Sequence, residues 1–371
     1  MSAMGSMRAV VFNGPQKVSV EQRPIPTLQE DGDVIVKVQA TALCGSPREL
    51  HVYRGHQPSE TGFIMGHEFT GTVVEKGAGV STINIGDRVV SPFTSSCYLS
   101  GGLPILIPFL SSMQCFYCKN GYTSRCVRSK LFGCGALDGG QAEYVRIPDA
   151  DGTAMKAPST ISDNALVLMA DIWPTGFFGA KSGFSMLKEE ERSNATAVVI
   201  GCGPVGLCAV LSALEYRPKH LFAIDSVDSR LELARGLGAE PLNFKTDRAG
   251  MERRIKEVTE GRGADVVIEV VGLSPALRTA FDIVRPWGVI ASIGVHNGEI
   301  PWTGTEAYGK NLRLQMGRCP VRAIFPEALA LLEKRQDKLG FMFDRIMPLS
   351  EAVEGYALFD QMKVQKVIFT P

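Results

Sequence analysis

The stretch VVIGCGPVGLCAVLSAL, residues 198–214, runs from an apolar segment through three glycines directly into a second apolar segment. Gly201, Gly203 and Gly206 are spaced as GxGxxG. In this motif the first glycine permits a tight turn, the second lets a pyrophosphate approach the backbone, and the third lets the helix pack closely on the strand. The stretch therefore predicts a strand, a phosphate-binding turn and a helix, in that order.

The next apolar segment, HLFAID, supports this interpretation because it ends at Asp225, about 20 residues after the glycines. A carboxylate at this position accepts hydrogen bonds from the ribose hydroxyls of NAD and repels the 2′-phosphate of NADP. GxGxxG alone is weak evidence, since an unrelated glycine-rich turn has the same spacing. The two features together predict NAD as the cofactor. Whether Arg230 faces the adenine ribose or solvent is left open.

The chain on either side of this stretch shows two different sequence patterns. From about residue 165 to 311, apolar runs such as ADVVIEVVG alternate with helical segments such as SPALRTAFDIV, which predicts a parallel sheet covered on both faces. Residues 7 to about 150 instead carry short alternating runs, including DVIVKVQAT and GTVVEKG, between Gly, Pro and Asp. These runs predict a mainly β domain. The expected fold class is therefore α/β with two domains.

Composition narrows the class of protein. A chain of 371 residues exceeds what one hydrophobic core usually supports. Its 39 basic and 39 acidic residues give zero net charge, so we expect neither nucleic acid nor an acidic membrane surface as a partner. No stretch reaches the roughly 20 uncharged apolar residues of a membrane span. We expect a cytoplasmic protein, in which the nine cysteines act as metal ligands or buried thiols rather than disulfides.

Residues able to bind a metal or move a proton lie in three segments that are far apart in the sequence. They are Cys44, Ser46, His51, His67, Glu68 and Asp171. A thiolate, an imidazole and one further donor leave a position open, which is the pattern of a catalytic zinc site. Taken singly, Cys44 is also explained as a buried thiol, His67 as a core histidine and Asp171 as a helix cap.

Together with the glycine motif, these segments resemble the zinc-dependent medium-chain alcohol dehydrogenase family over nearly the whole chain. The pattern GHExxGxVxxxGxxVxxxxxGDRV, from Gly66 to Val89, carries the resemblance. DIWPTGFFGA is similar to the branch of secondary-alcohol and glutathione-independent formaldehyde dehydrogenases, in which an aspartate replaces a ligand cysteine. The resemblance implies a GroES-like catalytic domain from residues 1–170 and 312–371, and a Rossmann domain from residues 171–311.

The resemblance also implies roles for individual residues. Cys44, His67 and Asp171 would bind a catalytic Zn²⁺, and Glu68 would be the carboxylate beside it. Thr175 would lie beside the nicotinamide.

A proton relay would run from the substrate oxygen through Ser46 to His51. The family spacing is CGSDxH, whereas this chain has Pro47 and Arg48 inserted and Glu49 where the aspartate is expected. His51 therefore comes two residues late, and the alternative that it is only a loop residue stays open.

The implied activity is hydride transfer between a small alcohol, or its aldehyde or ketone, and NAD. The segment GVIASIGVHNGEIPW resembles those through which family members pair their sheets, so we expect a homodimer or homotetramer. One alternative is a metal-free enone or quinone reductase on the same scaffold, against which the three metal-binding candidates argue. Another is a catalytically silent paralogue that keeps the nucleotide fold.

A second group of cysteines matches a further feature of the family, a structural zinc held by cysteines spaced C-x2-C-x2-C-x7-C. Cys115, Cys118 and Cys126 keep the last three positions, and Cys97 is the candidate for the first. Because the cost of closing a loop rises slowly with its length, we expect Cys97 to complete a second zinc site. The alternative is a three-cysteine remnant that binds zinc poorly.

Between Cys97 and Cys115 lie 17 residues, 98–114, where the family has two. The insertion includes the apolar run GGLPILIPFL, which is interrupted by Pro104 and Pro108 and is too short to span a membrane. It is interpreted as a flap over the pocket, a partner surface or a product of a misread gene structure, and the last is preferred.

Overall fold

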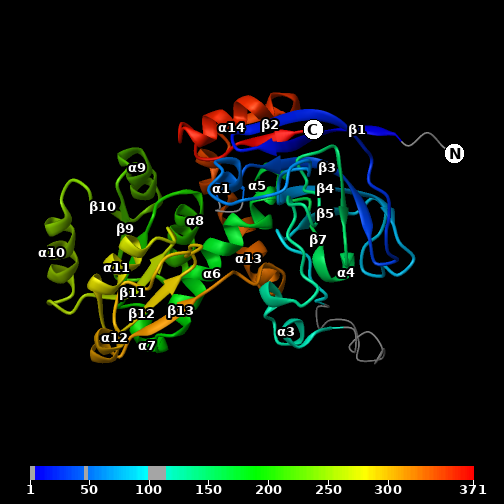
Figure 1. Cartoon of the computed structure of the whole chain (residues 1–371). Coiled ribbons are helices and arrows are strands. Elements are labelled where there is room, and N and C mark those ends of the chain that lie inside the picture. Colours follow the sequence, from blue (N-terminus) through cyan, green and yellow to red (C-terminus); the bar gives the residue numbers. More distant parts are fainter. Residues whose placement is uncertain (1–4, 46–48, 99–113) are drawn as a thin grey trace. The chain divides into compact units, whose positions relative to one another are not determined.

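The computed structural model describes residues 5–45, 49–98 and 114–371. Ser46 and nearly all of the insertion, residues 99–113, lie outside the described residues. The chain forms two compact units, Met1–Pro174 with Pro320–Pro371 and Thr175–Cys319 (Figure 1). The domain boundaries expected from the sequence, at 170/171 and 311/312, stay a prediction.

The unit Thr175–Cys319 contains a six-stranded sheet in the order β10-β9-β8-β11-β12-β13, in which every neighbouring pair is parallel. This order, 3-2-1-4-5-6 counted from β8, is that of the doubly wound dinucleotide-binding fold and confirms the predicted Rossmann class. Its elements, labelled in Figure 1, are α6 (Ile172–Ser185), which crosses the boundary between the units, α7 (Glu189–Arg192), β8 (Thr196–Ile200), α8 (Pro204–Ala213), η3 (Leu214–Tyr216), β9 (His220–Asp225), α9 (Asp228–Leu237), β10 (Glu240–Asn243), α10 (Arg248–Val258), β11 (Ala264–Glu269), α11 (Ser274–Ile283), β12 (Val284–Ser292), α12 (Gly304–Lys310) and β13 (Arg313–Met316).

The glycine turn joins β8 to α8 as the motif predicts. Gly201 has a φ of +94°, a conformation that L side chains rarely adopt. A Cβ on Gly206 would lie 1.7 Å from the carbonyl oxygen of Gly201, so only glycine allows this approach of helix to turn. Gly203 is the residue before the first turn of α8, and its backbone faces open space. The geometry leaves room for a phosphate at the N-terminus of α8.

The other unit is mainly β. A seven-stranded sheet has the order β14-β15-β3-β4-β5-β7, with β6 also paired to β3, and β1 and β2 form a separate hairpin. Its elements are β1 (Ser6–Gly14), β2 (Lys17–Pro24), β3 (Val34–Ala42), α1 (Leu50–Tyr53), β4 (Glu68–Lys76), β5 (Arg88–Ser91), α3 (Phe116–Lys119), η1 (Thr123–Arg125), β6 (Tyr144–Ile147), α4 (Ala150–Thr153), β7 (Met155–Lys156), α5 (Asp163–Leu166), η2 (Val167–Ala170), α13 (Val321–Arg335), η4 (Gln336–Lys338), η5 (Gly340–Met342), β14 (Ile346–Pro348), η6 (Leu349–Glu351), α14 (Ala352–Asp360) and β15 (Ile368–Thr370).

The two ends of the chain share this sheet. β3 pairs antiparallel with β4, which follows it, and with β15, which lies more than 300 residues later. In this register Ala42 lies opposite both Glu68 and Ile368. Residues just beyond Ala42, just before Glu68 and just before Ile368 therefore meet at one end of the three strands.

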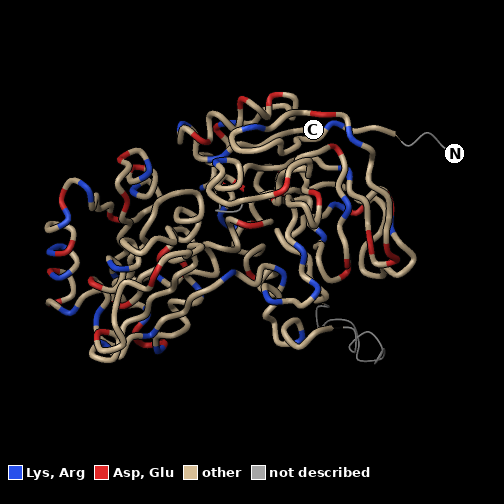
Figure 2. Tube along the Cα trace, in the orientation of Figure 1, with Lys and Arg blue, Asp and Glu red and all other residues tan. Residues whose placement is uncertain are grey.

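Charged residues are mixed along the described chain rather than separated into blocks (Figure 2). On α10, for example, Arg254 pairs with Glu240 of the neighbouring strand β10, and exposed pairs of this kind contribute little stability. Within the described residues, no helix combines the length and the apolar composition needed to cross a bilayer.

Candidate functional site

A cluster of four donor groups forms where β3 ends and β4 begins. Cys44 follows the last residue of β3 by two positions, and His67 and Glu68 stand at the start of β4. Gly66, which precedes them, has a φ of +92°, and a Cβ there would lie 2.5 Å from the side chain of Gln141. The turn into β4 therefore depends on glycine, and it directs His67 and Glu68 toward Cys44.

Asp171 joins the cluster from a distant part of the chain. It directly follows η2, and the backbone N–H of Phe93 donates to the carbonyl of Ala170 at 3.0 Å, which fixes this segment beside the end of β5. Asp171 Oδ2 lies 3.2 Å from His67 Nε2 and 3.5 Å from Cys44 Sγ. One ligand atom from each of Cys44, His67, Glu68 and Asp171 lies within 4.8 Å of all the others.

The electrostatics of this cluster favour a bound cation. Burial, and then the negative charges of Glu68 and Asp171, raise the pKa of Cys44 to about 12. Burial and the charge of Asp171 likewise raise the pKa of Glu68 to about 7, although Lys366 opposes them. Glu68 Oε1 is also buried without a hydrogen-bond partner among the described residues. A divalent metal ion would relieve this crowding, and a set of S, N and O donors fits Zn²⁺.

Glu49 faces the imidazole of His67 on the side opposite Asp171. Its Oε2 lies 3.2 Å from His67 Nδ1, while Asp171 Oδ2 faces Nε2. Glu49 Oε1 accepts a hydrogen bond of 2.7 Å from Gln141 Nε2 and lies 3.1 Å from the hydroxyl of Tyr356. A carboxylate on the far ring nitrogen fixes the tautomer and the orientation of a metal-binding histidine.

Lys366 is the buried cation of this site. Its Nζ lies 2.5 Å from Glu68 Oε2, and both side chains are almost fully buried, at 1% and 0% exposure. Burial acts to lower the pKa of Lys366, but the charges of Glu68 and Cys44 raise it above its usual value. Lys366 reaches this position because Leu43 N–H donates to the carbonyl of Val367 at 2.9 Å, where β15 pairs with β3.

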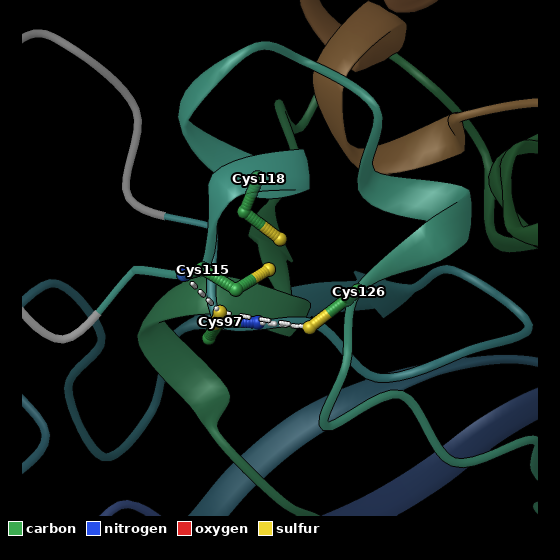
Figure 3. Close-up of side chains that lie close together, drawn as sticks. All are labelled: Cys97, Cys115, Cys118 and Cys126. Atoms are coloured by element: carbon green, nitrogen blue, oxygen red, sulfur yellow. Dashed lines mark hydrogen bonds between the residues drawn. The ribbon is translucent and has the colours of Figure 1, made fainter.

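The second cysteine group also converges (Figure 3). Cys97, Cys115, Cys118 and Cys126 place their sulfur atoms within 4.8 Å of one another, and all four are free thiols. Backbone amides support them: Cys97 N–H donates to Cys126 Sγ and Cys115 N–H donates to Cys97 Sγ, each at 3.3 Å. Burial raises the pKa of Cys115, but the amides of Cys118 and Val127 outweigh it and lower the pKa to about 6. Four thiols in this arrangement suit a closed, tetrahedral zinc site.

The residues predicted to bind the pyrophosphate and the adenosine lie together at the carboxyl ends of β8 and β9. Asp225 Oδ2 accepts a hydrogen bond of 2.7 Å from the N–H of Cys202, within the glycine turn. Its Oδ1 accepts from Ser226 N–H at 2.7 Å and Val227 N–H at 3.0 Å. Arg230, in the first turn of α9, is half-buried, and its charge acts on Cys202. Asp225 is thus held rigidly beside the turn that would bind a pyrophosphate.

The remaining predicted residues are His51, Thr175 and Ser46. His51 lies on α1, and its ring stacks edge-on against His56 with 5.2 Å between centroids. Burial, and then the charges of His56 and Arg54, lower the pKa of His51. Thr175 is half-buried on α6. Ser46 lies outside the described residues, so the relay between it and His51 stays a prediction.

The contacts of Glu49 and Lys366 were not predicted from the sequence. Glu49 was noted only as a departure from the family spacing, and Lys366 was read as part of the closing strand QKVIFTP. The sequence held one signal for Lys366, which directly precedes three apolar residues of the closing strand. A lysine buried with such a strand is expected to pair with an acidic residue, because buried lysines are rare unless they are paired.

Comparisons with known proteins agree with this geometry. Residues 30–159 match the alcohol dehydrogenase GroES-like domain family, and residues 204–334 match the zinc-binding dehydrogenase family. The chain is 63% identical to zinc-type alcohol dehydrogenase B of Aspergillus flavus, over 100% of this chain and 82% of that protein. It is 29% identical to the glutathione-independent formaldehyde dehydrogenase of Pseudomonas aeruginosa, over 99% of this chain and 98% of that protein. The structure of alcohol dehydrogenase TADH from Thermus sp. ATN1 superimposes with a TM-score of 0.87 at 33% identity, covering 98% of this chain and 99% of that one.

Replacing Lys366 with Met should leave the carboxylate of Glu68 buried without its cation. We expect the free energy of unfolding to fall by about 3–5 kcal/mol, as for other buried pairs that lose one partner. Urea unfolding measures this loss. The double variant Lys366→Met with Glu68→Gln should recover most of it, and a Lys366→Met protein as stable as the wild type would contradict the prediction.

Proposed function

The chain belongs to the zinc-dependent alcohol dehydrogenase family, and from this premise we propose that Cys44, His67 and Asp171 hold its catalytic zinc. The family makes it a zinc-containing oxidoreductase that acts on small alcohols or the corresponding carbonyl compounds. One observation carries the assignment of these ligands: a thiol, an imidazole and a carboxylate from three distant segments meet in one cluster beside the buried carboxylate of Glu68. That cluster also argues against the metal-free reductase, which has no need of it.

The residues around the cluster have separate roles in the reaction. Bound zinc supplies a Lewis acid that polarises the oxygen of an alcohol or carbonyl compound. Glu49 keeps the His67 ring oriented, with Nε2 toward the cluster. Lys366 offsets the charge of Glu68, so that this second carboxylate stays beside the ligands without being one of them.

The proton released by alcohol oxidation needs a path to water, and we propose His51 as its acceptor. Neutral imidazole is the form that accepts a proton. The lowered pKa of His51 keeps the ring neutral near pH 7, and the half-buried ring leads toward His56 at the surface. Ser46 would pass the proton to it.

NAD is the proposed cofactor, with the pyrophosphate at Gly201, Gly203 and Gly206 and the adenosine ribose at Asp225. The hydrogen bonds that Asp225 accepts from three backbone amides hold its charge where a 2′-phosphate would meet it. Thr175 is assigned to the nicotinamide end, and Arg230 to the adenosine end. We place the enzyme in the cytoplasm, where its nine cysteines stay reduced.

A homodimer or homotetramer is proposed from the sheet edge at β13. β13 is the last strand of the described sheet, and its Leu314 and Met316 are exposed. Tyr308, on the preceding helix α12, is 86% exposed. An exposed edge with apolar side chains is a template for pairing with another chain, which a second copy would supply.

We also propose that Cys97, Cys115, Cys118 and Cys126 hold a second, structural zinc. The two metal sites should then be separable by single substitutions. Asp171→Ala should lose one of two zincs per chain and reduce turnover at least about 100-fold, because that site loses a ligand. NADH binding should persist, since the nucleotide residues lie in the other unit. The matched variant Cys118→Ser should lose the zinc of the four-cysteine site. Its folded fraction should keep the turnover of the wild type. Metal analysis, fluorescence titration with NADH and alcohol-dependent NADH formation measure these outcomes. Unchanged turnover in Asp171→Ala would remove Asp171 from the site.

Cofactor choice tests the role of Asp225. The wild type should use NAD with an efficiency more than tenfold above that for NADP, a difference of about 1.4 kcal/mol or more. Asp225→Ser should reduce the preference for NAD over NADP, because it removes the carboxylate that repels the 2′-phosphate. Asp228→Ser is the control, because Asp228 is exposed three residues later in the same turn and should leave the ratio unchanged. Equal use of both cofactors by the wild type would overturn the assignment.

Sedimentation velocity tests the assembly. The wild type should sediment as a dimer or larger species, and Leu314→Lys should shift it toward the monomer by placing a charge at the paired edge. Val353→Lys, an exposed apolar position in the other unit, should leave the assembly intact. A wild-type protein that is monomeric at every concentration rules the proposal out.

A further inference from the structure

Arg322, in the first turn of α13, is a buried guanidinium whose surroundings do not fully satisfy it. The side chain is 5% exposed, and its Nε has no hydrogen-bond partner among the described residues. Nη2 donates to the backbone carbonyl of Asp151 at 3.1 Å. The carboxylate of Asp151 is engaged elsewhere, because its two oxygens accept hydrogen bonds from Ser81 and Thr82. A buried charge in this state is costly unless another charge compensates it.

The four-cysteine group lies next to this cation. Arg322 Cζ is 5.1 Å from the ring centroid of Tyr98, which directly follows Cys97 and packs on the cysteine group. α4 packs closely on the backbone of Tyr98, since a Cβ on Gly152 would lie 2.8 Å from Tyr98 N. α13 itself packs against η1, which leads to Cys126. Figure 3 shows the brown ribbon of α13 beside the cysteine lobe.

The charge of Arg322 fits the cysteine group best when a metal is bound. Four thiolates and one Zn²⁺ carry a net charge of −2, a larger negative charge than the metal-free thiols carry. Burial lowers the pKa of Arg322 to about 10, against the opposing charges of Tyr98, Asp151 and Cys118, so the side chain stays protonated at neutral pH. The N-terminus of α13 adds partial positive charge of the same sign.

We propose that Arg322 is the buried counter-cation of the metal-loaded four-cysteine site. It stabilises the thiolates that a soft divalent metal ion requires, without being a ligand. The inference rests on the second zinc of the proposed function and adds a positioning residue from a segment about 200 residues away from the cysteines in sequence.

The direct test is zinc retention. In Arg322→Met, one of the two zincs should bind about 10- to 100-fold more weakly, the range found when a residue that supports metal ligands is lost. Transfer of zinc to a chromophoric chelator measures this, and turnover before chelation should be unchanged. Arg322→Lys keeps the charge and should retain most of the affinity. Arg125→Met removes an exposed charge from the same lobe, and should change the affinity less than about threefold.

A second experiment asks whether Arg322 has a purely structural role. It compares the effect of Arg322→Met on stability with and without the second zinc site. Arg322→Met should lower the urea midpoint of the zinc-loaded protein, but have little effect in the Cys118→Ser background, in which this site holds no zinc. An equal loss in both backgrounds would overturn the inference. If the wild type holds only one zinc, the second site and Arg322's role in it both fail. If it holds two and Arg322→Met releases neither more readily, only the role of Arg322 fails.

Discussion

The pairing of β3 with both β4 and β15 is the constraint on which the catalytic unit depends. Its register brings residues just beyond Ala42, at Glu68 and just before Ile368 to one end of the sheet. Cys44, the His67–Glu68 pair and Lys366 are thereby gathered from both ends of the chain. A shift of one residue in either pairing would turn these side chains to the opposite face of the sheet.

Both candidate metal sites place a buried cation beside the metal-binding groups. Each collects groups that carry negative charge when a metal is bound, and each has a buried cation that is not a ligand: Lys366 beside Glu68, and Arg322 beside the cysteine lobe. Both cations come from the segment Pro320–Pro371, which returns to the first unit after the Rossmann domain is complete. The return of the chain therefore supplies charge compensation as well as the closing strand.

The nucleotide unit builds its site from close backbone packing and one fixed carboxylate. Gly206 approaches the carbonyl of Gly201 more closely than any other residue could, and the N–H of Cys202 between the glycines holds the carboxylate of Asp225. The glycine turn and the determinant of cofactor choice are thus one hydrogen-bonded structure. This coupling explains why the two features are informative together, although each is weak alone.

The sequence by itself determined the features that depend on short spacing. GxGxxG with Asp225 predicted the Rossmann sheet, and the pattern from Gly66 to Val89 predicted the family, because turns and strand starts are encoded by neighbouring residues. Four cysteines were also expected to meet despite the insertion, since a longer loop costs little. Only the tertiary structure decided what surrounds these groups. Glu49 against His67, Lys366 against Glu68 and Arg322 against the cysteine lobe are contacts between distant segments, and no local pattern specifies which buried charge will face which.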